Sequence, residues 1–302
     1  MEKLSFCIPT YNRASYLKNC IESILGYAGR DIEIVIQDNA SPDHTEQIVR
    51  NFSDGRIKYF RNNKNIGGVW NAMDIINNAN GEYIYYLSDD DMLLPGAIER
   101  ISDFILTYHP NAFKTDLMIF LEKTKKSYIY SYFNEDKYPG NSSANDIARI
   151  FMSSHVLTGV CFRKACLDMT YLKEYGDNWY PQMLLCGLSY RNLGYLAYPT
   201  AIHRGENETF WEINPNELAI LRTGVVNIVR ALAPRMEHDL HIHKEIVKEC
   251  LMCWNIIEHD LMHFIDEKTL RTIRRIQMAN VAKHRTYNML SFLKKQIKRL
   301  AK

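Results

Sequence analysis

Four short apolar segments alternate with helical patterns over the first 110 residues, and this alternation constrains the fold more than any other feature of the chain. The segments span Leu4–Ile8, Ile32–Ile36, Ile57–Phe60 and Tyr83–Leu87. Strands that alternate with helices form βαβ units, in which successive strands run parallel. The pattern therefore predicts an α/β protein with a mostly parallel sheet that is flanked by helices.

The fourth apolar segment runs directly into three consecutive carboxylates, Asp89, Asp90 and Asp91. Neighbouring carboxylates repel one another, and a hard divalent cation with oxygen ligands is the usual remedy. Ligands of open α/β sheets bind outside the carboxyl ends of the strands. The cluster therefore indicates a metal and phosphate site. The alternative is an acidic turn ahead of the helix that begins near Pro95.

The pattern changes after residue 108. Residues 117–121 and 127–133 predict an antiparallel pair of strands, and 156–162 and 194–203 predict two more. A helix over 145–152 is expected to be capped by Ser143 or Asn145. From about residue 215 the chain reads as helical to its end. We therefore predict a domain over 1–210, with halves 1–110 and 111–210, and a helical region over 211–302.

Composition excludes several protein classes. The chain has 302 residues and a net charge of +2, so it carries no overall signal for nucleic-acid binding. Its seven scattered cysteines do not resemble a disulfide framework. It contains no apolar run long enough to cross a membrane and no pattern of a signal peptide. These features predict a cytoplasmic protein.

Four polar motifs follow the predicted strands, and together they resemble glycosyltransferase family 2 over about residues 4–205. The motifs are CIPTYNR at 7–13, DNASPD at 38–43, NIGG at 65–68 and LSDDD at 87–91. The resemblance implies a GT-A fold, in which a Rossmann-like half binds a nucleotide sugar and a second half binds the acceptor. Bacterial enzymes that add sugars to O-antigen or capsule are the most similar members.

The resemblance also implies roles for single residues. The donor, a nucleotide-diphosphate sugar, is expected to contact residues of all four motifs, with Asp38 accepting a hydrogen bond from the base. These donor residues are Pro9, Thr10, Tyr11, Asn12, Arg13, Asp38, Asn65, Gly67, Ser88, Asp89 and Asp90.

The acidic cluster corresponds to the family's DxD motif, so Asp89, Asp90 and Asp91 are the expected ligands of Mn²⁺ or Mg²⁺. The flanking leucines and Pro95 align Asp90 with the principal metal ligand and put Ser88 at the motif's first Asp. The literal DxD is instead formed by Asp89 and Asp91.

The expected reaction is inverting transfer to a saccharide or lipid-linked acceptor, which needs a general base. The family's Glu-Asp pair falls on Pro181-Gln182 in this chain. Asp177 is the expected base, with Glu174 behind it, although an acid at a helix N-terminus is the alternative reading of Asp177. Without a base, the chain would be a nucleotide-sugar-binding module.

Two further patterns lie near the C-terminus. Residues 282–302 combine a leucine-rich stripe with lysine and arginine, as in helices that bind membrane surfaces or pack on their own domain. The resemblance favours peripheral contact with the inner face of the cytoplasmic membrane. His259 and His263 lie one helical turn apart, but the sequence lacks the glutamate of a zinc protease, which makes a metallohydrolase the weakest hypothesis.

Overall fold

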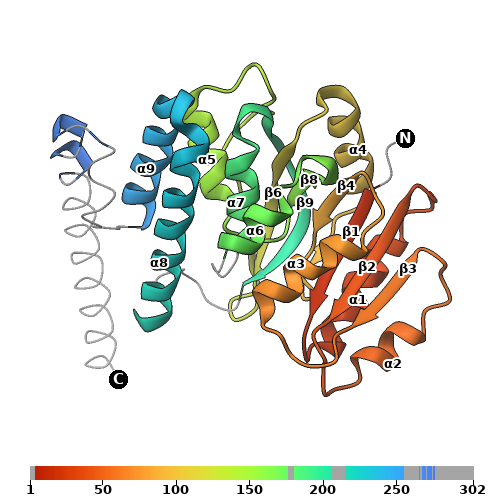
Figure 1. Cartoon of the computed structure of the whole chain (residues 1–302). Helices are drawn as coiled ribbons and strands as arrows, with labels where there is room; N and C mark the ends of the chain where they lie inside the picture. Colours follow the sequence, from red (N-terminus) through yellow and green to blue (C-terminus); the bar gives the residue numbers. More distant parts are fainter. Residues whose placement is uncertain are drawn as a thin grey trace, which may run out of the picture.

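The computed structural model describes residues 4–175, 180–205, 215–254, 265, 267–269, 271–273 and 275. Their strands form a single mixed sheet in the order β3-β2-β1-β4-β8-β6-β9-β5, with β7 paired to β6 (Figure 1). The strands are β1 Leu4–Thr10, β2 Ile32–Asp38, β3 Ile57–Arg61, β4 Tyr83–Tyr86, β5 Met92–Leu93, β6 Ala112–Leu121, β7 Lys126–Tyr130, β8 Val160–Arg163 and β9 Leu193–Gly205.

The first four strands are parallel, as the alternating pattern predicts. The predicted antiparallel pair is also confirmed, since β6 and β7 pair with Leu117 opposite Tyr130. Strand β5 was not predicted, because two residues are too few to produce a periodicity. It pairs antiparallel with β9 just after the acidic cluster.

Helices cover both faces of the sheet. They are α1 Ala14–Leu25, α2 Thr45–Arg50, α3 Gly68–Asn78, α4 Ala97–Tyr108, α5 Ala144–Ser153, α6 Met169–Tyr175, α7 Pro181–Leu188, α8 Pro215–Leu232 and α9 Leu240–Trp254. Ser143 caps α5 in a reciprocal capping box with Asp146, which confirms one of the two predicted caps.

The alternation of side chains along each strand separates two hydrophobic clusters. Along β1, Phe6 and Ile8 join the cluster under α1 and α4, whereas Cys7 joins the other. The second cluster includes residues of α3, α5, α7, α8 and α9, such as Phe151 and Val229. Helices α8 and α9 therefore pack against the same core as α5, beside which Figure 1 draws them. The predicted boundary near residue 210 remains a prediction.

The carboxyl ends of β1, β2 and β4 meet at one edge of the sheet, as expected for parallel neighbours. The amide of Asn39 donates to the carbonyl of Thr10 at 2.9 Å, and the hydroxyl of Thr10 donates to Asp89 at 2.7 Å. The long strand β9, parallel to β6, brings His203 and Arg204 to the same edge. Within the described part of the chain, no helix is both long and apolar enough to span a bilayer.

Candidate functional site

The acidic cluster divides into two parts with different partners. Asp89 and Asp90 both face the guanidinium of Arg13, whose Nη1 lies 3.3 Å from Oδ1 of Asp89 and forms a shorter ion pair with Asp90. Oδ2 of Asp89 accepts the hydrogen bond from Thr10. Two carboxylates thus share one cationic nitrogen at the carboxyl edge of the sheet.

Asp91 points into the protein and is fully buried. Its Oδ2 accepts hydrogen bonds from Thr158 at 2.5 Å and from Nδ1 of His203 at 3.0 Å, while its Oδ1 accepts from the amide of Arg204 at 3.0 Å. Asp91 therefore ties the end of β9 to the loop before β8. Among the described residues, no group of three His, Cys, Asp or Glu side chains could hold a metal ion, and the assignment of all three aspartates as metal ligands stays a prediction.

Two groups at this edge of the sheet, Asp89 and His203, have raised pKa values. Burial raises the pKa of Asp89 to about 6, although the hydrogen bond from Thr10 and the charge of Arg13 oppose the rise. For His203, burial alone would lower the pKa, but the hydrogen bond to Asp91 and its charge outweigh burial, and the pKa is raised. Asp89 thus keeps its proton to a higher pH than an exposed aspartate does.

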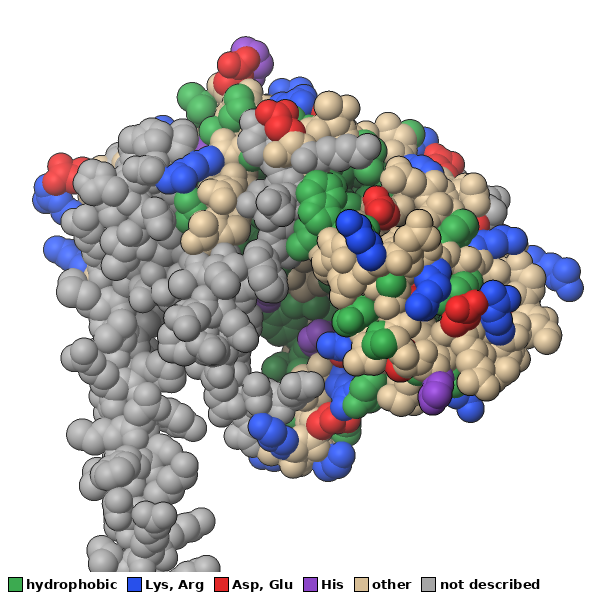
Figure 2. Space-filling model, turned by 60° about the horizontal axis from the view of Figure 1, so that its bottom comes forward, with side chains coloured by type: hydrophobic (Ala, Val, Ile, Leu, Met, Phe, Trp, Pro, Cys, Tyr) green, Lys and Arg blue, Asp and Glu red, His purple; other side chains and the backbone are tan. Residues whose placement is uncertain are grey.

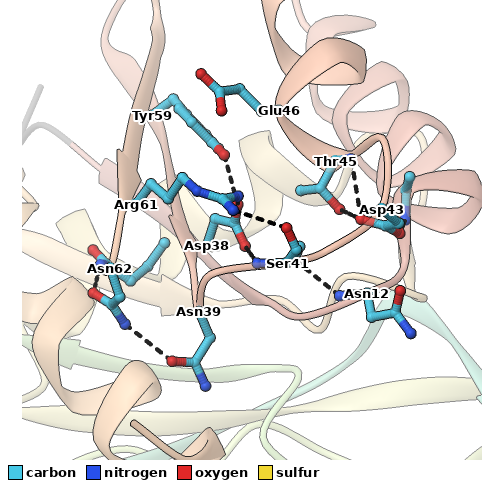
Figure 3. Close-up of polar contacts among 12 residues, drawn as sticks. Asn12, Asp38, Asn39, Ser41, Asp43, Thr45, Glu46, Tyr59, Arg61 and Asn62 are labelled. Atoms are coloured by element: carbon cyan, nitrogen blue, oxygen red, sulfur yellow. Dashed lines mark hydrogen bonds and ion pairs between the residues drawn. The ribbon is translucent and has the colours of Figure 1, made fainter. Parts of the chain in front are cut away.

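The second motif is organised around Asp38, which is fully buried (Figure 3). Its Oδ2 accepts a hydrogen bond from the hydroxyl of Tyr59 at 2.6 Å and pairs with Arg61, and its Oδ1 accepts from the amide of Ser41 at 2.8 Å. Arg61 also donates to the carbonyl of Ser41 at 2.9 Å. Asp38, which is expected to accept a hydrogen bond from the nucleotide base, therefore already accepts hydrogen bonds from the protein on both carboxylate oxygens. A nucleotide base that contacts Asp38 must displace one of these protein donors.

The third motif leads from β3 into α3. Asn39 joins it to the second motif, because its Nδ2 donates to Asn65 at 2.9 Å and its Oδ1 accepts from the amide of Ile66 at 2.9 Å. Gly67 has a φ of +89°, which disfavours residues with a side chain, and a Cβ there would meet no atom within 4 Å. The open space above Gly67 leaves room for a ligand near the backbone.

A cleft of about 750 Å³ begins beside Gly67 and extends to the start of α7. Its walls are mainly apolar and include Trp70, Tyr180 and Gln182. Figure 2 looks toward this edge of the molecule and shows a hollow lined by hydrophobic side chains, with a histidine and basic side chains on its wall. Positions Pro181 and Gln182 thus line a cavity, but neither is a carboxylate.

The predicted residues meet in part. Thr10, Arg13, Asp89 and Asp90 come together, and the amide of Asn12 donates to Ser41 at 2.9 Å. The amide of Ser88 donates to Thr158 at 2.9 Å. Glu174 is exposed on α6. Asp177, the histidines at 259 and 263 and the tail over 282–302 lie outside the described residues.

Several polar residues of this region were not predicted. Lys114 is buried in β6, its Nζ donates to the carbonyl of Thr158 at 2.7 Å, and burial lowers its pKa to about 7. A lysine inside the apolar run around 112–121 was the available signal. Tyr59 and Arg61 lie on β3, whose side chains are partly buried or exposed. Nothing in the sequence of this strand distinguishes a hydrogen-bond partner of Asp38 from a solvated side chain.

Comparison with known proteins finds sequences similar to parts of this chain. A model of the family described as "Glycosyl transferase family 2" matches residues 5–162. The GalNAc(5)-diNAcBac-PP-undecaprenol beta-1,3-glucosyltransferase of Campylobacter jejuni is 40% identical over 104 residues, 33% of this chain and 34% of the relative. Abequosyltransferase RfbV of Salmonella typhimurium is 38% identical over 107 residues, 34% of this chain and 32% of the relative. The matches thus span about a third of each of these relatives.

Solved structures extend the likeness over most of the fold. The structure of S. aureus TarS 1–349 in complex with UDP-GlcNAc has a TM-score of 0.59 and 16% identity, and covers 92% of this chain and 89% of that chain. This likeness confirms the expected GT-A fold.

Proposed function

The chain belongs to glycosyl transferase family 2, and we propose from this that it moves a sugar from a nucleotide-diphosphate donor to a saccharide acceptor with the help of a divalent cation. The observation that carries the proposal is the meeting of Thr10, Arg13, Asp89 and Asp90 at the carboxyl edge of the sheet. Ligands of open α/β sheets bind at this edge. We propose that the reaction serves bacterial surface polysaccharides, and two bacterial relatives that are named as sugar transferases support this.

Asp89 and Asp90 fit the proposed cation. Both offer carboxylate oxygens, the ligands that Mn²⁺ and Mg²⁺ prefer, and both already face one cationic nitrogen of Arg13. When bound, the cation would neutralise charge that develops on the leaving diphosphate. Asp91 is assigned a supporting role, because its oxygens hold Thr158, His203 and Arg204.

The raised pKa of Asp89 predicts that Mn²⁺ affinity falls at acid pH. With a pKa of about 6 in the metal-free protein, Asp89 binds a proton below that pH, and the cation must displace it. We expect the affinity to fall by up to about tenfold per pH unit below pH ~6. The same raised pKa means that Asp89 lowers the stability of the metal-free fold as pH rises from about 4 to about 6. Electron paramagnetic resonance of free Mn²⁺ across this range measures the affinity, and a pH-independent affinity would contradict the assignment.

Asp38 is proposed to hold the base end of the donor. We expect Asp38→Ala to weaken binding of the nucleoside diphosphate by about 1–3 kcal/mol, the usual loss for a hydrogen bond to a charged group. Tyr59→Phe is the matched control, since it removes one protein donor from Asp38 and keeps the acceptor. Calorimetric titration measures both. Unchanged affinity in Asp38→Ala would remove Asp38 from the site.

The apolar cleft between α3 and α7 is proposed to bind the acceptor. Sugar rings expose C–H faces that pack on aromatic side chains, and Trp70 lines this cleft. We expect Trp70→Ala to raise the KM for the acceptor about tenfold, with donor binding unchanged, because a buried aromatic contact is worth about 1–2 kcal/mol. Leu106→Ala, at an exposed position of α4, is the control. Initial rates at saturating donor test this, and an equal loss of donor affinity would argue against a separate acceptor cleft.

The acceptor is proposed to be lipid-linked, which would bring the protein to the inner membrane surface. The support is the basic, leucine-rich sequence over 282–302, together with a relative whose name includes an undecaprenol diphosphate. Several basic residues near an anionic leaflet can give reversible binding without a lipid anchor.

Transfer is tested by incubating the protein with a panel of nucleotide sugars and saccharide acceptors, with and without Mn²⁺. We expect Mn²⁺-dependent release of nucleoside diphosphate and a longer saccharide. Binding of a nucleotide sugar without any turnover would instead favour a donor-binding module, the alternative that the glutamine at position 182 supports.

A further inference from the structure

We infer that Arg13 occupies the cation position in the metal-free protein and moves to the diphosphate when metal and donor bind. The inference rests on the proposed function and adds a role for one residue. Arg13 would thus oppose binding of the metal alone and favour binding of metal and nucleotide together.

The first support is the position of the guanidinium. A single nitrogen, Nη1 of Arg13, contacts Oδ1 of Asp89 and Oδ2 of Asp90. Each carboxylate has a second oxygen, but a cation that bridged the two contacted oxygens would lie where this nitrogen lies. Two cationic groups at one position repel each other, so a metal bound between these oxygens would displace the side chain.

The second support is that the side chain can move while its backbone stays. The carbonyl of Arg13 accepts hydrogen bonds from the amides of Tyr16 at 3.0 Å and Leu17 at 3.1 Å, which fixes the start of α1. The side chain is 46% exposed. A rotation toward solvent therefore leaves the helix intact and needs no change in the core.

The third support is the chemistry of the displaced group. A guanidinium is always charged and binds phosphate oxygens through two parallel hydrogen bonds. Once its side chain has left Asp89 and Asp90, the backbone of Arg13 still keeps the residue close to the two carboxylates. The guanidinium could then reach a diphosphate bound to a cation at that site. Arg13 thus exchanges one negatively charged partner, the two carboxylates, for another, the diphosphate.

The test uses the full chain and two matched variants. Arg13→Gln removes the charge, and Lys18→Gln removes one from the same helical segment at a residue paired with Glu22. Mn²⁺ binding without nucleotide is followed by electron paramagnetic resonance. Calorimetry at saturating Mn²⁺ first identifies which of UDP, CDP, GDP and dTDP the wild-type protein binds most tightly. The affinity for that nucleotide is then measured in both variants. Melting curves verify that both variants fold.

Opposite changes in the two affinities are the expected result. Arg13→Gln should bind Mn²⁺ about tenfold more tightly than wild type and the nucleotide about tenfold more weakly, whereas Lys18→Gln should change neither by more than about twofold. Mn²⁺ affinity that is unchanged or lower in Arg13→Gln, or nucleotide affinity that is unchanged, would overturn the inference while the metal site stands. If neither wild type nor Arg13→Gln binds Mn²⁺, the metal dependence of the proposed function fails as well.

Discussion

Asp90→Asn is expected to abolish sugar transfer and leave the protein folded. The substitution keeps the shape of the side chain but removes the charge that we propose for the cation. Electrostatic stabilisation of a leaving group of this kind is worth several kcal/mol, so turnover should fall by at least about 10³-fold. Asp90 is only partly exposed and its ion pair is with Arg13, a surface partner, so little stability depends on it.

Three measurements make this prediction specific. Turnover and Mn²⁺-dependent nucleotide binding should both be lost, while the melting temperature should stay near that of wild type. Asp103→Asn, the same chemical change on the exposed surface of α4, should leave all three unchanged. Normal transfer by Asp90→Asn would mean that the alignment of the acidic cluster, or the metal itself, is wrong.

Asp177→Asn is expected to slow turnover by about 10²–10⁴-fold, the range for loss of a general base, without weakening the donor. The acceptor hydroxyl must lose its proton as it attacks, and neither Pro181 nor Gln182, which line the cleft, can take it. Asp177 is the nearest carboxylate before α7 in the sequence. Single-turnover rates at saturating donor, with donor affinity measured separately, distinguish the two effects.

The stereochemistry of the product tests the same mechanism independently. One base on the acceptor side and a single displacement invert the anomeric centre, and nuclear magnetic resonance of the product reports its configuration. A product with retained configuration would refute the mechanism. Full activity in Asp177→Asn would refute only the residue, and Glu174→Gln, on the exposed side of α6, would then be the next variant to measure.

Local sequence patterns were sufficient to predict the main strands and helices of the fold. Strands such as Ile32–Asp38 are buried along their whole length, so their sequences are mainly apolar runs that can be recognised. Ser143 is a favourable N-cap residue, which indicates where the following helix begins. Parallel strands end at one edge, so the polar residues after β1, β2 and β4 had to meet. The place of the candidate site at this edge could therefore be predicted from the order of strands and helices alone.

Pairing between distant residues was not predictable. Asp89, Asp90 and Asp91 are equivalent in the sequence, but their surroundings differ because Arg13 lies 76 positions before Asp89 and His203 lies 112 positions after Asp91. Likewise, the partners of Asp38 are determined by how β3 pairs with β2.

The sequence by itself determined the α/β class, the parallel direction of the first four strands and the edge at which the polar motifs gather, because each follows from apolar patterns within single elements and from the alternation of strands with helices. Only the tertiary structure decided that Arg13 holds Asp89 and Asp90 while Asp91 anchors β9. It also decided that Trp70 and Gln182 line one cleft. These roles depend on burial and on contacts between remote segments, which exist only after the chain has packed.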